Sequence, residues 1–296
     1  MTVTASTLSA PESGRAGWTQ GVRSEWTKLR SVRSTWVSVV IIVVAGVGLS
    51  ALVSNIEAGR WTTLGLVDRA QFDPVRFSQT GVFISQFVVG VLGALVITSE
   101  YSTGSIRTTL SAVPHRTTVL AAKAVVVGVV ILVLSEVTAF LSFFVGQLVL
   151  TAHGGRGLPS NASILSQVRS PTIPVVSITD PGALRAVFLC GVYLTLLSLI
   201  AFGIGFSLRH TAGAISLFVG VLLVIPLIIQ IFPASIADPI ERFLPSNLGL
   251  AMIEVGTRKT DFAGVLLTPW AATGVLAVYA TVVVTVGGLL LVRRDA

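Results

Sequence analysis

Charged residues and cysteine are scarce in this sequence. Asp, Glu, Lys and Arg make up 11% of the 296 residues, compared with about 25% in a typical soluble domain. Hydrophobic residues make up 53%. The single cysteine, Cys190, excludes a disulfide framework and a thiolate metal cluster. This composition is typical of a polytopic membrane protein.

Sequence motifs for catalysis are also absent. The chain contains no GxxxxGK[ST] nucleotide loop, no HExxH and no GxSxG. Its histidines, His115, His153 and His210, lie outside or at the edge of the long apolar runs, which leaves no ligands there for haem or a catalytic metal. We therefore predict that the chain is not an enzyme by itself and uses no metal or cofactor. Energy for any driven process has to enter from another chain.

Long uncharged apolar runs dominate what the sequence does contain. A helix needs roughly 20 residues to cross about 30 Å of hydrocarbon. Six runs are long enough: 35–54, 79–99, 124–150, 186–208, 212–232 and 270–292. The predicted fold is an all-α integral membrane protein, with a disordered tail at 1–17 and a single six-span membrane domain at 18–296. Pro226 predicts a kink in the fifth span, and the apolar connection 233–269 predicts short interfacial or re-entrant helices.

Basic residues flank the membrane ends of both termini. Six spans place the two termini on the same side, and positive residues favour the cytoplasm. The residues concerned are Arg15, Arg23, Lys28, Arg30, Arg33, Arg293 and Arg294. We predict a multi-pass protein of the plasma membrane with both termini, and the connection 100–123, in the cytoplasm. Because such residues anchor to lipid headgroups, the net charge of +7 does not indicate nucleic-acid binding.

The segment 18–36 has the periodicity of an amphipathic elbow helix. At 100° per residue its apolar side chains fall within an arc of about 120°. They are Trp18, Val22, Trp26, Leu29, Val32 and Trp36. Glu25 and Arg33 violate the pattern because they fall inside this arc. The helix is either a plain interfacial anchor or an elbow whose Glu25 and Arg33 contact a cytoplasmic partner.

The connection 100–123, EYSTGSIRTTLSAVPHRTTVLAAK, resembles a cytoplasmic handle between two spans. Ser102 and Thr103 precede Gly104 as a helix-start signal, and Pro114 ends the apolar helical spacing that begins at Ile106. The predicted element is a short coupling helix between spans two and three. Glu100 would cap this helix or pair with a basic residue such as Arg107. An ordinary solvated loop is the alternative.

Glu136 is the one acidic or basic residue within the six runs. A carboxylate near the middle of a span is costly and by default marks a function. It is either a proton-coupling site or a group with a structural or substrate-lining role, and the lack of a basic partner in any other run favours the second interpretation.

Three segments together resemble a known family. These are SEWTKLRSVRSTW (Ser24–Trp36), the connection 100–123 and FLPSNLGLAM (Phe243–Met252). They are similar to segments of the permease subunits of ATP-binding-cassette (ABC) transporters of the type-2 export class, particularly the actinobacterial members. The likeness extends over nearly the whole chain from Trp18, although its motifs are less specific than a nucleotide-binding loop.

The resemblance implies a permease that pairs with a second copy or a paralogue and with separate ABC ATPase subunits in the lipid bilayer. It assigns coupling to the ATPase to Glu100, Tyr101, Thr103, Gly104 and Arg107, with Glu25, Lys28 and Arg30 as secondary contacts. The substrate would be a small or lipid-like molecule that the family does not name. The alternatives are a proton-coupled secondary transporter that uses Glu136 and a membrane scaffold without transport activity.

Overall fold

The computed structural model describes residues 18–31, 33–106, 116–157, 170–255 and 266–293. Within them, six helices are long and apolar enough to cross a membrane, which confirms the predicted fold class. The spans are Trp36–Arg60, Val82–Thr103, Leu120–Ala152, Ala183–Leu208, Thr211–Ile229 and Pro269–Leu290. The predicted tail at 1–17 lies outside the described residues.

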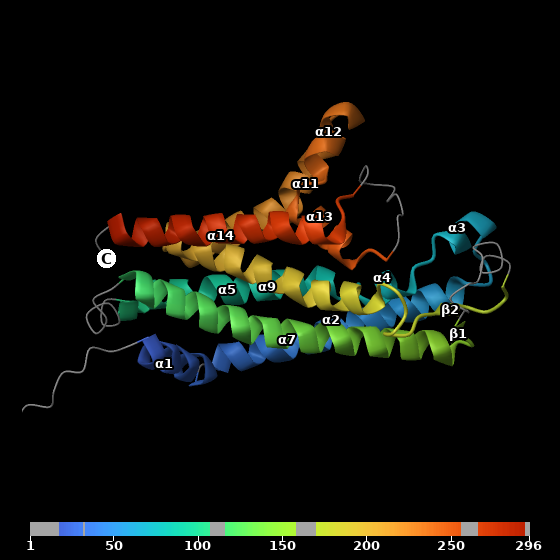
Figure 1. Cartoon of the computed structure of the whole chain (residues 1–296), viewed down its shortest axis with the longest axis horizontal. Coiled ribbons are helices and arrows are strands. Elements are labelled where there is room, and N and C mark those ends of the chain that lie inside the picture. The colour runs from blue at the N-terminus through green and yellow to red at the C-terminus, as the bar shows by residue number, and fades with distance from the viewer. Residues whose placement is uncertain (1–17, 32, 107–115, 158–169, 256–265, 294–296) are drawn as a thin grey trace, which may run out of the picture.

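The spans belong to helices that lie side by side along the long axis of the molecule (Figure 1). They are α2 (Arg33–Arg60), α5 (Val82–Thr103), α7 (Arg116–Ala152), α9 (Ala183–Leu208), α10 (Thr211–Val219) and α14 (Pro269–Arg293). We call the end that carries α1 (Trp18–Ser31) the α1 end. The opposite end, which carries the short parallel strands β1 (Arg156–Gly157) and β2 (Pro174–Val175), is the β end.

Helix α9 is the centre of the bundle. In its most apolar window 78% of the residues are buried, whereas no other span exceeds 56%. Small residues allow its neighbours to approach closely. A Cβ on Gly203 would lie 2.8 Å from the backbone of Val283 in α14, and one on Gly93 of α5 would clash with the Ser198 carbonyl. The core therefore forms where backbones meet, while the outer faces of α2, α7 and α14 expose apolar side chains suited to lipid.

The fifth span is interrupted, as Pro226 predicts. After α10 the chain forms one π-helical segment, η1 (Gly220–Val224), and then α11 (Ile225–Ile229), which has Pro226 at its second position. Proline removes one helical donor and crowds the preceding turn, and a widened π turn accommodates both effects. Beyond this point α11 and α12 (Ala234–Glu241) project away from the bundle (Figure 1).

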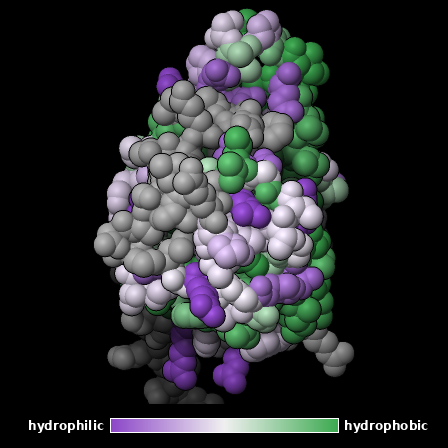
Figure 2. Space-filling model, turned by 90° about the vertical axis from the view of Figure 1, so that its right-hand side faces the viewer, coloured by the Kyte–Doolittle hydropathy of each residue, from purple (hydrophilic) through white to green (hydrophobic). Residues whose placement is uncertain are grey.

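Short helices and buried aromatic residues close the β end. Helices α3 (Leu66–Ala70) and α4 (Pro74–Ser78) join the first two spans, and Trp61 and Phe72 pack there edge to face with ring centroids 5.1 Å apart. The predicted short helices within 233–269 are present as α12 and α13 (Pro245–Ile253). Figure 2 looks onto this end, where hydrophilic and neutral residues cover much of the coloured face and hydrophobic ones lie along one side.

The predicted elbow helix is shorter than the sequence pattern indicates. Helix α1 ends at Ser31 and α2 begins at Arg33, so Arg33 and Trp36 belong to the helix of the first span and not to the elbow. The Trp36 Nε1–H donates to the carbonyl of Arg30 at 3.0 Å, which connects the two helices at the point where the chain turns into the membrane.

Candidate functional site

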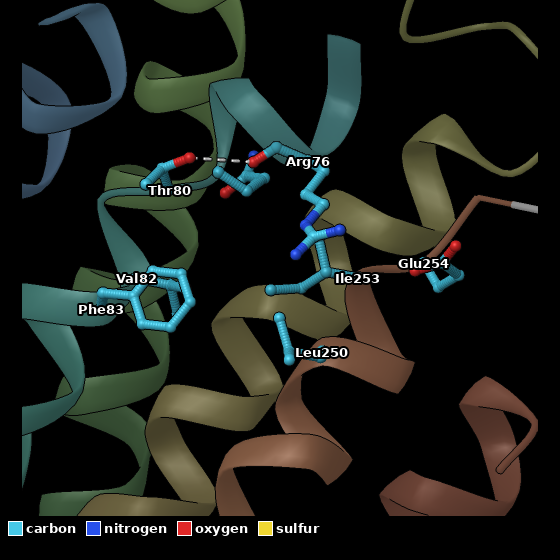
Figure 3. A pocket seen from close by; sticks show the side chains of 8 residues that line it. Arg76, Thr80, Val82, Phe83, Leu250, Ile253 and Glu254 are labelled. Carbon is cyan, nitrogen blue, oxygen red and sulfur yellow. Dashed lines mark hydrogen bonds between the residues drawn. The ribbon is translucent and has the colours of Figure 1, made fainter. Parts of the chain in front are cut away.

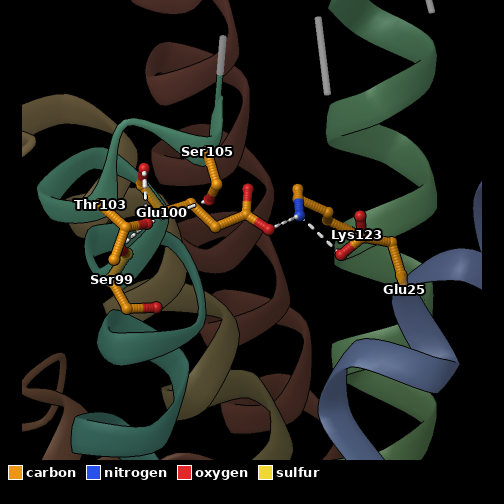
Figure 4. A network of polar contacts seen from close by, with 6 residues as sticks. All are labelled: Glu25, Ser99, Glu100, Thr103, Ser105 and Lys123. Atoms are coloured by element: carbon orange, nitrogen blue, oxygen red, sulfur yellow. Dashed lines mark hydrogen bonds and ion pairs between the residues drawn. The ribbon is translucent and has the colours of Figure 1, made fainter. Parts of the chain in front are cut away.

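A buried lysine joins three elements at the α1 end. Lys123, in the second turn of α7, has no exposed surface. Its ammonium group donates to Oε2 of Glu25 in α1 at 2.6 Å and to Oε1 of Glu100 in α5 at 2.7 Å (Figure 4). We call these residues the Glu25–Lys123–Glu100 cluster. It connects the elbow helix, the end of span two and the start of span three.

The electrostatics of the cluster favour a fixed arrangement. Glu25 and Glu100 are 5% and 9% exposed, so three ionisable groups share one buried volume with two carboxylates around one ammonium. Removing one partner from a buried ion pair leaves an uncompensated charge and typically costs about 3–5 kcal/mol. The three helix segments therefore cannot separate here without a large electrostatic penalty.

The cluster explains why Glu25 violates the amphipathic pattern of the elbow. Its carboxylate lies among the apolar positions because that face of α1 packs on α7, where Lys123 is its partner. Glu100 likewise has a basic partner, Lys123, while Arg107 lies outside the described residues. Lys123 was not among the site residues that the sequence predicted. One feature of the sequence could have indicated it: Lys123 directly precedes an apolar run, and Glu25 and Glu100 also lie close to the ends of apolar runs.

Tyr101, the residue after Glu100, contacts a different part of the bundle. The guanidinium carbon of Arg209 lies 5.2 Å from the centre of its ring, and the ring meets Phe206 edge to face. Arg209 is the C-cap of α9, with a left-handed φ of 56°, in the short turn that leads into α10. Adjacent residues at the end of α5 thus contact α1 and α7 on one side and the α9–α10 turn on the other.

Helix α5 ends in a hydroxyl-rich turn. Ser102 and Thr103 both donate to the carbonyl of Ser99 at 2.9 Å, and the Thr103 hydroxyl also forms a hydrogen bond of 3.1 Å with the Ser105 hydroxyl. They therefore form the last turn of α5, ahead of Gly104. Gly104 is the C-cap, with φ of 71°, and a Cβ there would meet no atom within 4 Å.

Residues 105 and 106 are again helical, and the rest of the predicted coupling helix, with Arg107, lies outside the described residues. The remaining predicted coupling residues, Lys28 and Arg30, lie in α1, with the Arg30 side chain exposed. The structure thus brings Glu25 and Glu100 together through Lys123. Tyr101, Thr103 and Gly104 follow Glu100 at the end of α5, and Figure 4 shows Thr103 next to the cluster.

Residues 22–168, about half of the chain, match the family model described as ABC-2 family transporter protein. The chain belongs to the ABC-2 transporter family. It is thus a multi-pass permease of an ABC transporter, a kind of membrane component that is itself non-enzymatic and works with an ATP-binding subunit. The matched region contains all three residues of the Glu25–Lys123–Glu100 cluster. No curated protein matches the permease chain.

Glu136 lies at the midpoint of the third span of this permease. It is half-buried where α7 packs on α9, and a Cβ on Gly191 of α9 would lie 2.5 Å from its Cδ. Neither carboxylate oxygen has a hydrogen-bond partner among the residues that the structure describes. In that same part of the chain, no group of three or more His, Cys, Asp or Glu side chains could hold a metal ion.

The permease also contains an apolar cavity of about 410 Å³ beside the second half of α9. Side chains of α9, α10, η1, α13 and α14 line it, among them Phe218, Leu222, Tyr279 and Val283. Its size is within the usual range for small-molecule pockets, about 300–1,000 Å³. A second pocket, between α4, the start of α5 and α13, holds only about 20 Å³, with Arg76 and Ile253 facing across it (Figure 3).

Proposed function

We propose that the chain forms the substrate path of an ABC exporter in the plasma membrane as one of two permease copies. Separate ATPase subunits would drive it through the α1 end, which would face the cytoplasm together with both termini. The observation that carries this proposal is the Glu25–Lys123–Glu100 cluster, because it links the elbow helix, span two and span three at the connection where an ATPase would engage.

The contacts at the end of α5 offer two routes for a mechanical signal. Displacement of the segment that starts at Gly104 would act first on Glu100 and Tyr101, which are in the same helical turn. Through Lys123, Glu100 would move α7 and α1; through Arg209, Tyr101 would move the α9–α10 turn. Packed helices slide as rigid bodies, so ATP binding would shift the equilibrium between two arrangements of the spans.

In this proposal the predicted coupling residues fall into two groups, those that transmit movement within the permease and those that contact the ATPase. Glu25 and Glu100 are buried and paired inside the chain, so they would transmit movement within the permease instead of touching the ATPase. Exposed groups such as Gly104, Thr103 and Arg30 would form the docking surface itself. Arg107 stays in the proposed docking surface on the resemblance alone.

Co-purification tests the proposal directly. The tagged permease is extracted from its native membrane in mild detergent, and accompanying proteins are identified by mass spectrometry. We expect an ATPase subunit to accompany the wild type and to be lost from Gly104→Arg. Gly154→Arg is the matched control, since Gly154 also has a positive φ, of 84°, and open space around its Cα, but lies at the β end.

Recovery of the permease without any ATPase, or equal recovery from Gly104→Arg and wild type, would argue against docking at the α1 end. The energy source of transport distinguishes the proton-coupled alternative from the ATP-driven exporter. An uncoupler that leaves ATP high would stop transport driven through Glu136 and leave ATP-driven transport intact. A scaffold would transport nothing under either condition.

A further inference from the structure

Arg242 lies at the depth of the sixth span, although in the sequence it belongs to the connection 233–269. The Tyr279 hydroxyl donates to the carbonyl of Phe243, the next residue, at 3.3 Å. Tyr279 is residue 11 of the 22-residue span Pro269–Leu290, so about 15 Å of helix separates it from either end at 1.5 Å per residue. The connection therefore carries a guanidinium group to a level near the middle of this span.

The charge of Arg242 is not compensated by the described part of the chain. Its side chain is exposed, and the ion pairs among the described residues do not include it. Asp238, one turn earlier on α12, is exposed too, and Glu241 is buried; neither forms an ion pair with Arg242. A guanidinium stays charged at every physiological pH. Within a membrane such a group typically faces a cavity and marks a substrate pathway.

The apolar cavity of about 410 Å³ adjoins this cation. Phe243 is part of its wall, and the guanidinium carbon of Arg242 lies 5.1 Å from the centre of the Phe243 ring. Phe243 and Leu217, which also lines the cavity, are 39% and 48% exposed, so the cavity opens onto the surface of the chain. Apolar cavities stay dry and accept apolar ligands. A permanent positive charge thus lies beside an accessible space for an apolar group.

We propose that Arg242 and this cavity bind the anionic group and the apolar body of an amphipathic anion, the substrate class that this permease carries. A guanidinium forms strong, paired hydrogen bonds with carboxylate and phosphate groups, and the apolar body of the same molecule would fill the cavity. This inference rests on the proposed transport function, and it adds the charge and the amphipathic character of the substrate.

Equilibrium binding of radiolabelled decanesulfonate to the full-length permease in phosphatidylcholine nanodiscs tests the inference without ATP or an ATPase. This probe is a permanent anion on a single alkyl chain, and empty nanodiscs measure its partition into lipid. We expect saturable binding to wild type. Decyltrimethylammonium, which has the same chain and the opposite charge, should show no saturable binding.

Two pairs of variants separate the charge from the cavity. Arg242→Gln should bind decanesulfonate about tenfold more weakly, as expected for loss of a charge-assisted hydrogen bond. Arg156→Gln removes an exposed charge at the β end and should bind as wild type. Leu222→Trp adds bulk to the buried wall of the cavity and should abolish saturable binding. Leu223→Trp adds the same bulk to a neighbour that is 49% exposed, and it should bind as wild type.

Equal affinity of Arg242→Gln and wild type, equal binding of the cation, or unchanged binding to Leu222→Trp would each overturn the inference. Absence of saturable binding to wild type would also overturn it, and this is the result expected if a second copy of the chain fills the cavity. Thermal unfolding of all four variants identifies a loss of binding that comes from misfolding, and the comparison of anion with cation on wild type needs no variant. None of these outcomes depends on the ATPase, so loss of the anion site and loss of the ATP-driven function are distinguishable.

Discussion

Lys123 of α7 and Glu25 of α1 are 98 residues apart in sequence, yet their side chains form a buried ion pair of 2.6 Å. Glu100 completes the arrangement from the end of α5 at 2.7 Å. The elbow helix is therefore attached to the membrane domain by charge as well as by apolar packing. Any movement of one of the three elements acts on the other two.

The first prediction concerns stability. Lys123→Met leaves two buried carboxylates without their common cation, and we expect the free energy of unfolding to fall by about 3–5 kcal/mol, measured by titration with SDS. Arg60→Met removes the cation of the exposed Glu57 pair and should cost no more than about 1 kcal/mol. Equal losses in the two variants would mean that burial of the cluster does not increase the contribution of its ion pairs to the free energy of unfolding.

The second prediction separates stability from coupling. In Glu25→Gln/Lys123→Met/Glu100→Gln no buried charge is left unpaired, so we expect most of the stability lost in Lys123→Met to return, because replacing a whole buried ion pair is often neutral. Transport per ATP hydrolysed, measured in vesicles with the ATPase subunit, should nevertheless fall several-fold. A triple variant that transports with wild-type efficiency would show that the cluster only stabilises the fold.

The third prediction concerns the ring of Tyr101. Tyr101→Phe keeps the ring beneath the Arg209 guanidinium and against Phe206, whereas Tyr101→Leu removes both contacts. A cation–π contact contributes about 0.5–2 kcal/mol, so we expect Tyr101→Leu to lower ATP-driven transport and Tyr101→Phe to retain it. If the two variants behave alike, the ring is not part of the route to the α9–α10 turn.

The fourth prediction tests the fit of Glu136 against α9. Gly191→Ala places a methyl group 2.5 Å from the Cδ of Glu136, and overpacking of this kind costs about 1–3 kcal/mol of unfolding free energy. Adding Glu136→Ala should recover most of that loss, which a double-mutant cycle detects as non-additivity. Gly128→Ala, whose added methyl would lie 3.8 Å from Leu199, is the control and should not destabilise. Strict additivity of Gly191→Ala and Glu136→Ala would contradict the contact.

Hydrophobicity alone was sufficient to predict the spans, since the six apolar runs coincide with the six candidate membrane helices to within a few residues at most ends. Pro226 predicted the interruption of span five. It did not predict the π segment before it, because a helix can relieve the clash of a proline ring with the preceding turn in more than one way. The elbow was predicted to reach Trp36 because an apolar periodicity continues smoothly through the point where α1 ends and α2 begins.

By itself, the sequence determined that this protein crosses a membrane six times, that its ionisable groups are few, and that Glu25 and Glu136 are exceptions to their surroundings. Only the tertiary structure decided what those exceptions meet: Glu25 shares Lys123 with Glu100, whereas Glu136 packs against Gly191 with no cation from the described chain. The physical reason is that apolar burial depends on local composition, while an ion pair depends on which helix faces come together over long separations in the chain.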